Sequence, residues 1–148
     1  MSENQDSKAI VRRRMQATRE ELFDAWTDQE GMRAWMCPGD VVSADMRLDP
    51  RVGGKLHITM HSPTATYEHT GEFRVVERPS KLVFTWTAEN FDGQITLVTI
   101  EFLEVSRTET ELILTHERIP RKDLAERYQS GWGKIVATLE QRLEAQHA

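Results

Sequence analysis

Two histidines occupy positions from which the imidazole ring can face the interior of the protein. His116 ends an alternation of apolar residues that begins at Leu112, and His69 shares a strand face with Phe73, because side chains two residues apart lie on the same side of a strand. An imidazole exchanges protons near neutral pH, so either ring could be the general base of a cyclase or hydrolase. Either could equally be a hydrogen-bonded core histidine. The sequence holds no Gly-x-Ser-x-Gly elbow and no other nucleophile–base constellation, so we assign no catalytic residue and keep these two histidines as candidates.

The remaining side chains of metal-binding or redox type do not assemble into a site. His57 and His61 share a strand face, but His57 alternates with the apolar Ile58 and so faces water, away from His69. Histidines hold zinc only when their rings converge on one point, so we predict no metal and no cofactor. Cys37 is the only cysteine. It excludes an internal disulfide, fits a reducing compartment, and is expected to be an inert, half-buried thiol.

A long helix at the C-terminus must form one side of any interior site. Between residues 120 and 148 the apolar side chains recur at spacings of three and four, which is one stripe of a helix. The stripe consists of Leu124, Tyr128, Trp132, Ile135, Leu139 and Leu143. Gly131 and Gly133 flank Trp132 in mid-helix, although each glycine costs a helix about 1 kcal/mol relative to alanine. We interpret them as a place where the backbone presses against another element or leaves room for something.

The rest of the chain predicts strands, with two short helices near the start. Thr18 to Glu21 forms a capping box that begins a helix through Trp26, because each of the two side chains can bond the other's backbone amide. A second short helix is expected from Asp28 to about Trp35. Strands are predicted over residues 9–16, 41–48, 55–60, 67–76, 81–88, 94–105 and 111–119.

Alternation within these strands gives one dry face and one wet face. In the strand over 67–76, for example, Phe73 and Val75 are assigned to the dry face and Glu72 and Arg74 to the wet face. An antiparallel sheet packed on one side has this pattern. We therefore predict an α+β fold in which a curved antiparallel sheet of seven strands grips the C-terminal helix, an arrangement that usually encloses a cavity.

Composition narrows the class of protein. The 148 residues suffice for one domain, which we place at residues 9–145, after a polar, disordered tail over 1–8. The net charge is −5, and an acidic chain repels phosphate backbones, so we expect no nucleic-acid partner. The basic run Arg12 to Arg14 is expected to be a solvated edge. No apolar stretch is long enough to span a membrane, and no secretory leader is evident, so a cytoplasmic location is predicted.

Several segments together resemble a known family, the one named after activators of the ATPase of the ninety-kilodalton heat-shock protein. The resemblance lies in the order and spacing of the segments at 21–28, 32–36, 49–55, 71–73, 82–86, 110–116 and 131–132, and it extends over residues 9 to 145. The family belongs to the START-like superfamily. This resemblance implies a helix-grip fold with a deep cavity between the sheet and the C-terminal helix, as in lipid carriers, hormone receptors and polyketide cyclases.

The first functional hypothesis is a non-enzymatic binding protein for a small hydrophobic molecule that is aromatic, lipid-like or polyketide-like. Aromatic pockets with a few polar groups suit such molecules. The expected binding residues are Trp35, Tyr67, His69, Trp86, Phe102, His116, Tyr128 and Trp132. Each ring could instead simply fill the core. The other hypotheses are a cyclase or hydrolase that uses a cavity histidine, and a chaperone-interaction module. The protein could be a monomer or a homodimer.

Overall fold

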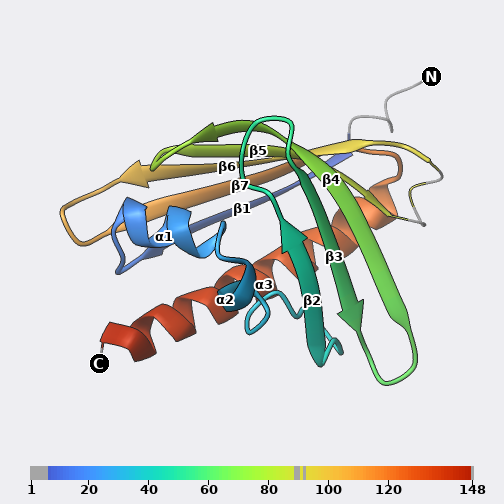
Figure 1. The fold of residues 1–148 in the computed structure, drawn as a ribbon, viewed down its shortest axis with the longest axis horizontal. Helices are drawn as coiled ribbons and strands as arrows, with labels where there is room; N and C mark the ends of the chain where they lie inside the picture. The colour runs from blue at the N-terminus through green and yellow to red at the C-terminus, as the bar shows by residue number, and fades with distance from the viewer. Residues whose placement is uncertain (1–6, 89–90, 92, 148) are drawn as a thin grey trace.

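The architecture is a curved sheet crossed by one long helix (Figure 1). The computed structural model describes residues 7–88, 91 and 93–147. In chain order the elements are β1 (Ser7–Met15), α1 (Arg19–Ala25), α2 (Gln29–Met32), β2 (Ser43–Leu48), β3 (Lys55–His61), β4 (Thr66–Glu77), β5 (Lys81–Ala88), β6 (Thr96–Glu104), β7 (Thr110–Ile119) and α3 (Lys122–His147). The predicted fold class and its order of elements are confirmed.

The sheet has seven strands in the order β1-β7-β6-β5-β4-β3-β2. Every neighbouring pair is antiparallel. Figure 1 shows β2 to β4 bending away from the plane of the other strands, with α3 crossing beneath the concave face and α1 and α2 beside it. The curved sheet thus wraps around α3, and β2 to β4 run away from the helix at one end of the molecule (Figure 1).

The two short helices differ in how well their sequence signals define them. The capping box of α1 is confirmed: Thr18 Oγ1 accepts from the Glu21 amide at 3.1 Å, and the Glu21 carboxylate accepts from the Thr18 amide at 2.9 Å. The second helix is shorter than predicted and ends at Met32, with residues 33–35 in turns. Gly31 and the absence of a side-chain cap on Asp28 leave this segment little helix-forming strength of its own.

One strand departs from simple alternation. The pairing of β4 with β5 shifts between Phe73 and Val75, where an irregularity of the β-bulge type interrupts the ladder. After it, Val76 pairs with Leu82 and packs on the core, while Val75 pairs with Val83. The prediction that Val75 shares the inner face with Phe73 is therefore wrong, because an extra residue in one strand reverses the faces beyond it.

The first strand is bound to the last helix. Ser7 and Lys8 belong to β1, so the predicted tail is shorter than eight residues; the rest of that prediction, residues 1–6, lies outside the described residues. The Gln129 side chain accepts from the Ile10 amide at 2.8 Å and donates to the Ile10 carbonyl at 2.5 Å. Arg13 pairs with Glu140 of α3 at 2.6 Å. The Gln129 contacts occupy two backbone groups of an edge strand that would otherwise stay unpaired, and the ion pair fixes the same strand to α3 through side chains.

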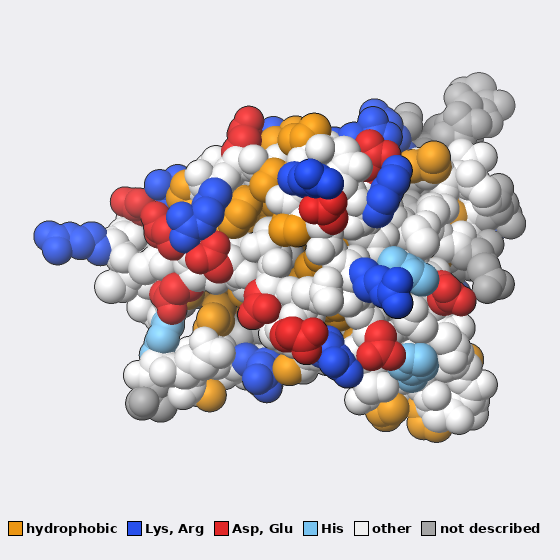
Figure 2. Space-filling view, in the orientation of Figure 1, with side chains coloured by type: hydrophobic (Ala, Val, Ile, Leu, Met, Phe, Trp, Pro, Cys, Tyr) orange, Lys and Arg blue, Asp and Glu red, His pale blue; other side chains and the backbone are white. Residues whose placement is uncertain are grey.

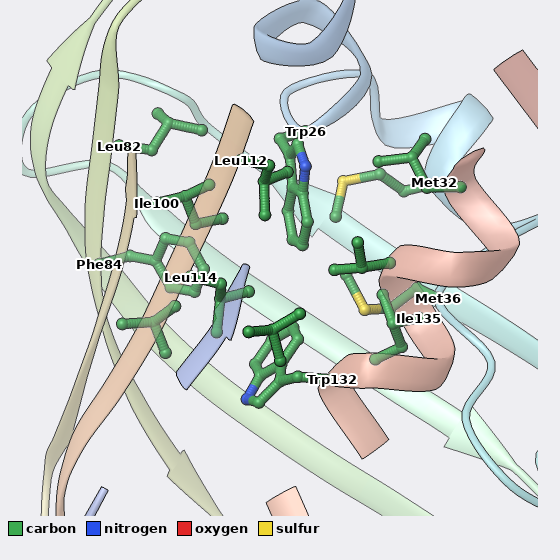
Figure 3. Packing of buried hydrophobic residues seen from close by; sticks show 14 of the residues in the cluster. Trp26, Met32, Met36, Leu82, Phe84, Ile100, Leu112, Leu114, Trp132 and Ile135 are labelled. Atoms are coloured by element: carbon green, nitrogen blue, oxygen red, sulfur yellow. The ribbon is translucent and has the colours of Figure 1, made fainter. Parts of the chain in front are cut away.

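The core lies between the concave face of the sheet and α3. The predicted stripe of α3 faces it: every member is buried except Tyr128, which is partly buried. Figure 3 shows Trp132 and Ile135 of α3 directed toward Leu114 and Ile100 of the sheet, with the methionines Met32 and Met36 filling the space on the α2 side. Burial of these apolar surfaces is the main force that holds the helix in the grip.

The face of the molecule seen in Figure 2 carries Lys, Arg, Asp and Glu side chains intermixed, with small apolar areas between them. Among the described residues, no helix has the length and apolar character needed to cross a membrane.

Candidate functional site

A cavity of about 680 Å³ lies between α3 and the strands β3 to β5, with the segment after α2 at its mouth. Its apolar and aromatic lining comes from Pro38, Val41, Met60, Tyr67, Trp86, Ala88, Tyr128, Trp132 and Ile135. The other lining residues are Gly39, Asp40, Thr66, Glu68, His69, Arg127, Ser130, Gly131 and Lys134. The volume lies within the range of about 300–1,000 Å³ that is typical of small-molecule sites.

The two mid-helix glycines have different surroundings. Gly131 lines the cavity, and a β-carbon added to it would meet only Pro38, at 3.8 Å. Gly133 is not part of the lining, and a β-carbon there would meet nothing within 4 Å. Gly131 therefore leaves room at the mouth of the cavity, which is one of the two interpretations that the sequence allowed, whereas Gly133 contacts no other element closely.

His116 is completely engaged in a buried hydrogen-bond chain. The Trp132 Nε1–H donates to His116 Nδ1 at 3.0 Å, and His116 Nε2 lies 2.7 Å from Thr96 Oγ1. The Thr96 hydroxyl in turn donates to the Trp86 carbonyl at 2.6 Å. Since an indole N–H can only donate, Nδ1 is the acceptor and Nε2 carries the proton. We refer to His116, Thr96 and Trp132 as the satisfied end of the interior.

Electrostatics agrees with this neutral tautomer. Burial lowers the pKa of His116 to about 3, with a smaller contribution from His69, because a charged ring is disfavoured where water is excluded. A general base needs a free nitrogen lone pair within reach of the substrate proton. Both nitrogens of His116 are bonded within the protein, and the residue does not line the cavity. Its geometry is that of a structural histidine.

His69 lies in a different environment. It is 7% exposed, lines the cavity, and stacks on Trp86 with ring centroids 4.8 Å apart and an interplanar angle of 23°. Burial lowers the pKa of His69 to about 4, so its ring is uncharged at neutral pH. Within the described part of the chain, no group meets hydrogen-bond geometry with its Nδ1 or with the Nε1 of Trp86, and both atoms are buried. The Trp86 indole does interact with the Tyr128 hydroxyl, whose pKa it lowers against the larger effect of burial. We refer to His69 and Trp86 as the open end.

Tyr128 joins the two ends. Its ring packs edge-on against His116 at 5.0 Å and in a tilted arrangement against Phe91 at 5.3 Å, and burial raises the pKa of its hydroxyl. Phe91 is fully buried, and the sequence analysis missed it. The residue stands alone between two predicted strands, with no alternation around it, so its aromatic character in a turn segment was the only available signal.

The structure divides the predicted binding residues into two groups. Five of them line the cavity: Tyr67, His69, Trp86, Tyr128 and Trp132. Tyr67 is 42% exposed and forms part of the rim. Trp35 and Phe102, like His116, lie outside the lining: Trp35 packs on Trp26 at 4.9 Å and Phe102 on Phe23 at 5.8 Å. Alternation placed Phe102 on the inner face, and Trp35 was expected near the mouth of the cavity. Neither expectation could say which part of the interior α1 and α2 cover.

Charged side chains surround the mouth of the cavity. Arg127 and Lys134 of α3 are exposed on one side, with the small residue Ser130 between them, and the exposed Asp40 lies in the loop on the other side. Glu68 of β4 also belongs to the lining, but its carboxylate pairs with His57 on the other face of the sheet. The sequence analysis missed these residues because surface charges carry no periodic signal. The mouth therefore combines both signs, while the interior of the cavity is aromatic and uncharged.

Metal and thiol chemistry receive no support from the described residues. No group of three potential ligands comes together among them. His57 and His61 instead pair singly with Glu68 and Asp45, each at 3.0 Å. Burial raises the pKa of the Cys37 thiol, so the reactive thiolate form is disfavoured.

Comparison with known proteins supplies the family. The model of the family described as Activator of Hsp90 ATPase homolog 1-like protein matches residues 16–144. The chain belongs to this family. The resemblance inferred from segment order and spacing is confirmed. The comparison with the curated proteins finds no match.

Solved structures agree with this assignment over nearly the whole chain. The AHSA1 protein from Silicibacter pomeroyi is 21% identical, with a TM-score of 0.81 and coverage of 95% of this chain and 99% of that one. An HSP90 activator from Plasmodium falciparum is 27% identical, with a TM-score of 0.74 and coverage of 93% and 96%. A protein from Rhodobacter sphaeroides is 23% identical, with a TM-score of 0.78 and coverage of 94% and 93%. The START-like helix-grip architecture is thus shared.

Proposed function

We propose that this protein binds a small, flat, apolar molecule in the cavity between the sheet and α3. The observation that carries the proposal is the cavity itself: about 680 Å³ of space, open to solvent at its mouth, whose walls include Trp86, Trp132 and Tyr128. Aromatic walls gain dispersion and stacking energy from flat ligands. The family's fold is consistent with a ligand-binding domain.

The two glycines of α3 provide a matched pair of variants. Gly131→Leu places a side chain at the cavity mouth, beside Pro38, whereas Gly133→Leu places the same side chain two residues away, outside the lining. Both changes remove a helix-weakening glycine by the same substitution, so both should keep the fold. Only the first should obstruct the cavity.

The experiment is a titration of intrinsic tryptophan fluorescence with flat aromatics, fatty acids and polyketide-like compounds. We expect saturable quenching by one chemical class, with affinity at least about tenfold weaker in Gly131→Leu and unchanged in Gly133→Leu, because occupying the mouth removes ligand contacts. Equal affinities in the two variants would place the ligand elsewhere. No response to any class would refute the binding function.

A second candidate function is stimulation of a chaperone ATPase. It is favoured by the 27% identity to the HSP90 activator from Plasmodium falciparum, over 93% of this chain. The test is a direct ATPase assay with the purified chaperone: stimulation that survives Gly131→Leu would separate this function from the cavity, and no stimulation would reject it.

A cyclase or hydrolase that uses a cavity histidine would have to use His69, since His116 has no free nitrogen. A pKa of about 4 makes His69 a weak base. The geometry therefore supports a binding protein more than a cyclase or hydrolase.

A further inference from the structure

The open end carries polar atoms that the protein itself does not satisfy. His69 Nδ1 and Trp86 Nε1 are both buried without a partner among the described residues, and both side chains line the cavity. A buried polar group without a partner is strongly destabilising, and native structures keep few of them. The satisfied end differs in this respect, because both nitrogens of the His116 ring have hydrogen-bond partners within the protein.

The kind of partner follows from the chemistry of these atoms. An indole N–H is a donor only, so Trp86 needs an acceptor. His69 is neutral at neutral pH and has one ring N–H to donate. The cations that line the cavity, Arg127 and Lys134, are exposed at its mouth. A carboxylate next to His69 would therefore be buried without a counter-ion, which is costly.

We propose that the buried end of the ligand carries an uncharged acceptor oxygen, as in an aromatic ketone, which accepts hydrogen bonds from the indole N–H of Trp86 and the ring of His69. This inference rests on the proposed function, since it names the ligand chemistry of the same cavity. Both nitrogens are screened from solvent, so a neighbouring wall side chain must move aside when the ligand binds. Tyr128 is partly buried and its hydroxyl interacts with the Trp86 indole without reaching hydrogen-bond geometry. It is therefore the side chain that a ligand acceptor would displace from Trp86.

Three probes with one ring system test the ligand chemistry: fluorene, 9-fluorenone and fluorene-9-carboxylate. They place a methylene, a carbonyl oxygen or an anion at the same position. Calorimetric titration of the full chain should show 9-fluorenone binding at least about tenfold more tightly than fluorene, because the carbonyl pairs with buried donors that are otherwise unpaired. The carboxylate should bind more weakly than either.

Variants then identify the atoms that discriminate. His69→Phe and Trp86→Phe each keep an aromatic ring and remove its nitrogen atoms. The ratio of the affinities for 9-fluorenone and fluorene should therefore fall toward unity, while fluorene still binds. Trp26→Phe is the matched control: the Trp26 Nε1 is also buried without a partner, but the residue does not line the cavity. Its removal should leave the preference unchanged.

The possible outcomes separate this inference from the proposed function. If fluorene and 9-fluorenone bind equally tightly, or if the preference survives both His69→Phe and Trp86→Phe, the acceptor-oxygen inference is wrong although the cavity still binds. If the carboxylate binds most tightly, the mouth cations select the ligand and the inference is again wrong. If none of the three binds, the proposed function fails for flat aromatics, and the inference fails with it.

Discussion

The two buried histidines look alike in the sequence and occupy opposite situations in the structure. His116 bonds through both ring nitrogens to Trp132 and Thr96, while His69 has a buried Nδ1 without a partner in the described part of the chain and lines the cavity. One interior therefore has a satisfied end and an open end, and Tyr128 lies between them, against His116 on one side and Trp86 on the other. The difference teaches that inward direction alone does not define a site, and that the state of a residue's polar atoms does.

The largest expected effect comes from breaking the satisfied end. His116→Leu removes a ring and leaves the Trp132 indole N–H without its acceptor and the Thr96 hydroxyl without its donor. We expect a loss of about 3 kcal/mol in the free energy of unfolding, because buried groups that lose their partners cost about 1–3 kcal/mol each. Urea unfolding measures this loss. A value below about 1 kcal/mol would show that the hydrogen bonds of His116 contribute little to stability.

Stability should also decline in acid, because both histidines have a folded-state pKa below their usual value. The native state then binds fewer protons than the unfolded state between pH 6.5 and the folded pKa values of about 4 for His69 and about 3 for His116. Their contribution is fully present above pH 6.5 and is lost as the pH falls through this range, by up to about 1.4 kcal/mol per pH unit for each group. Unfolding at several pH values should show this slope.

A variant at the open end separates the contributions of the two histidines to the pH dependence of stability. His69→Phe should remove about one proton from the uptake on unfolding near pH 5 and leave the contribution of His116 in place. An unchanged proton uptake in this variant would mean that His69 is accessible to water and titrates normally in the folded protein.

The smallest stability effect is expected at the open end. His69→Phe keeps the stacking on Trp86, which has centroids 4.8 Å apart, and removes a polar atom that has no partner. The free energy of unfolding at pH 7 should change by less than about 1 kcal/mol, because replacing an unsatisfied polar group by an apolar one is close to neutral. A loss as large as that of His116→Leu would erase the difference between the two ends.

The sequence predicted the framework well for a physical reason. Strand alternation and the stripe of α3 report burial directly, so the seven strands, the capping box of α1 and the inward direction of Trp132 could all be predicted. The face of Val75 was predicted wrongly because a bulge reverses the faces of a strand without a clear sequence signal.

The site was less predictable, since it depends on which elements cover which part of the interior. Trp35 and Phe102 face inward as predicted but are covered by Trp26 and Phe23. The hydrogen bonds of His116 join β7, β6 and α3, and no local pattern encodes a contact between segments so far apart. The same holds for the placement of Pro38 against Gly131.

The most direct test follows the four tryptophan indole N–H signals by nuclear magnetic resonance while 9-fluorenone is added, with each signal assigned through a Trp→Phe variant. The account predicts a saturable downfield shift of the Trp86 signal, as its unpaired N–H gains an acceptor, while the Trp26 signal, equally unpaired but outside the cavity, stays in place. A Trp86 signal that does not move at saturating probe, or a Trp26 signal that moves in its place, would contradict it.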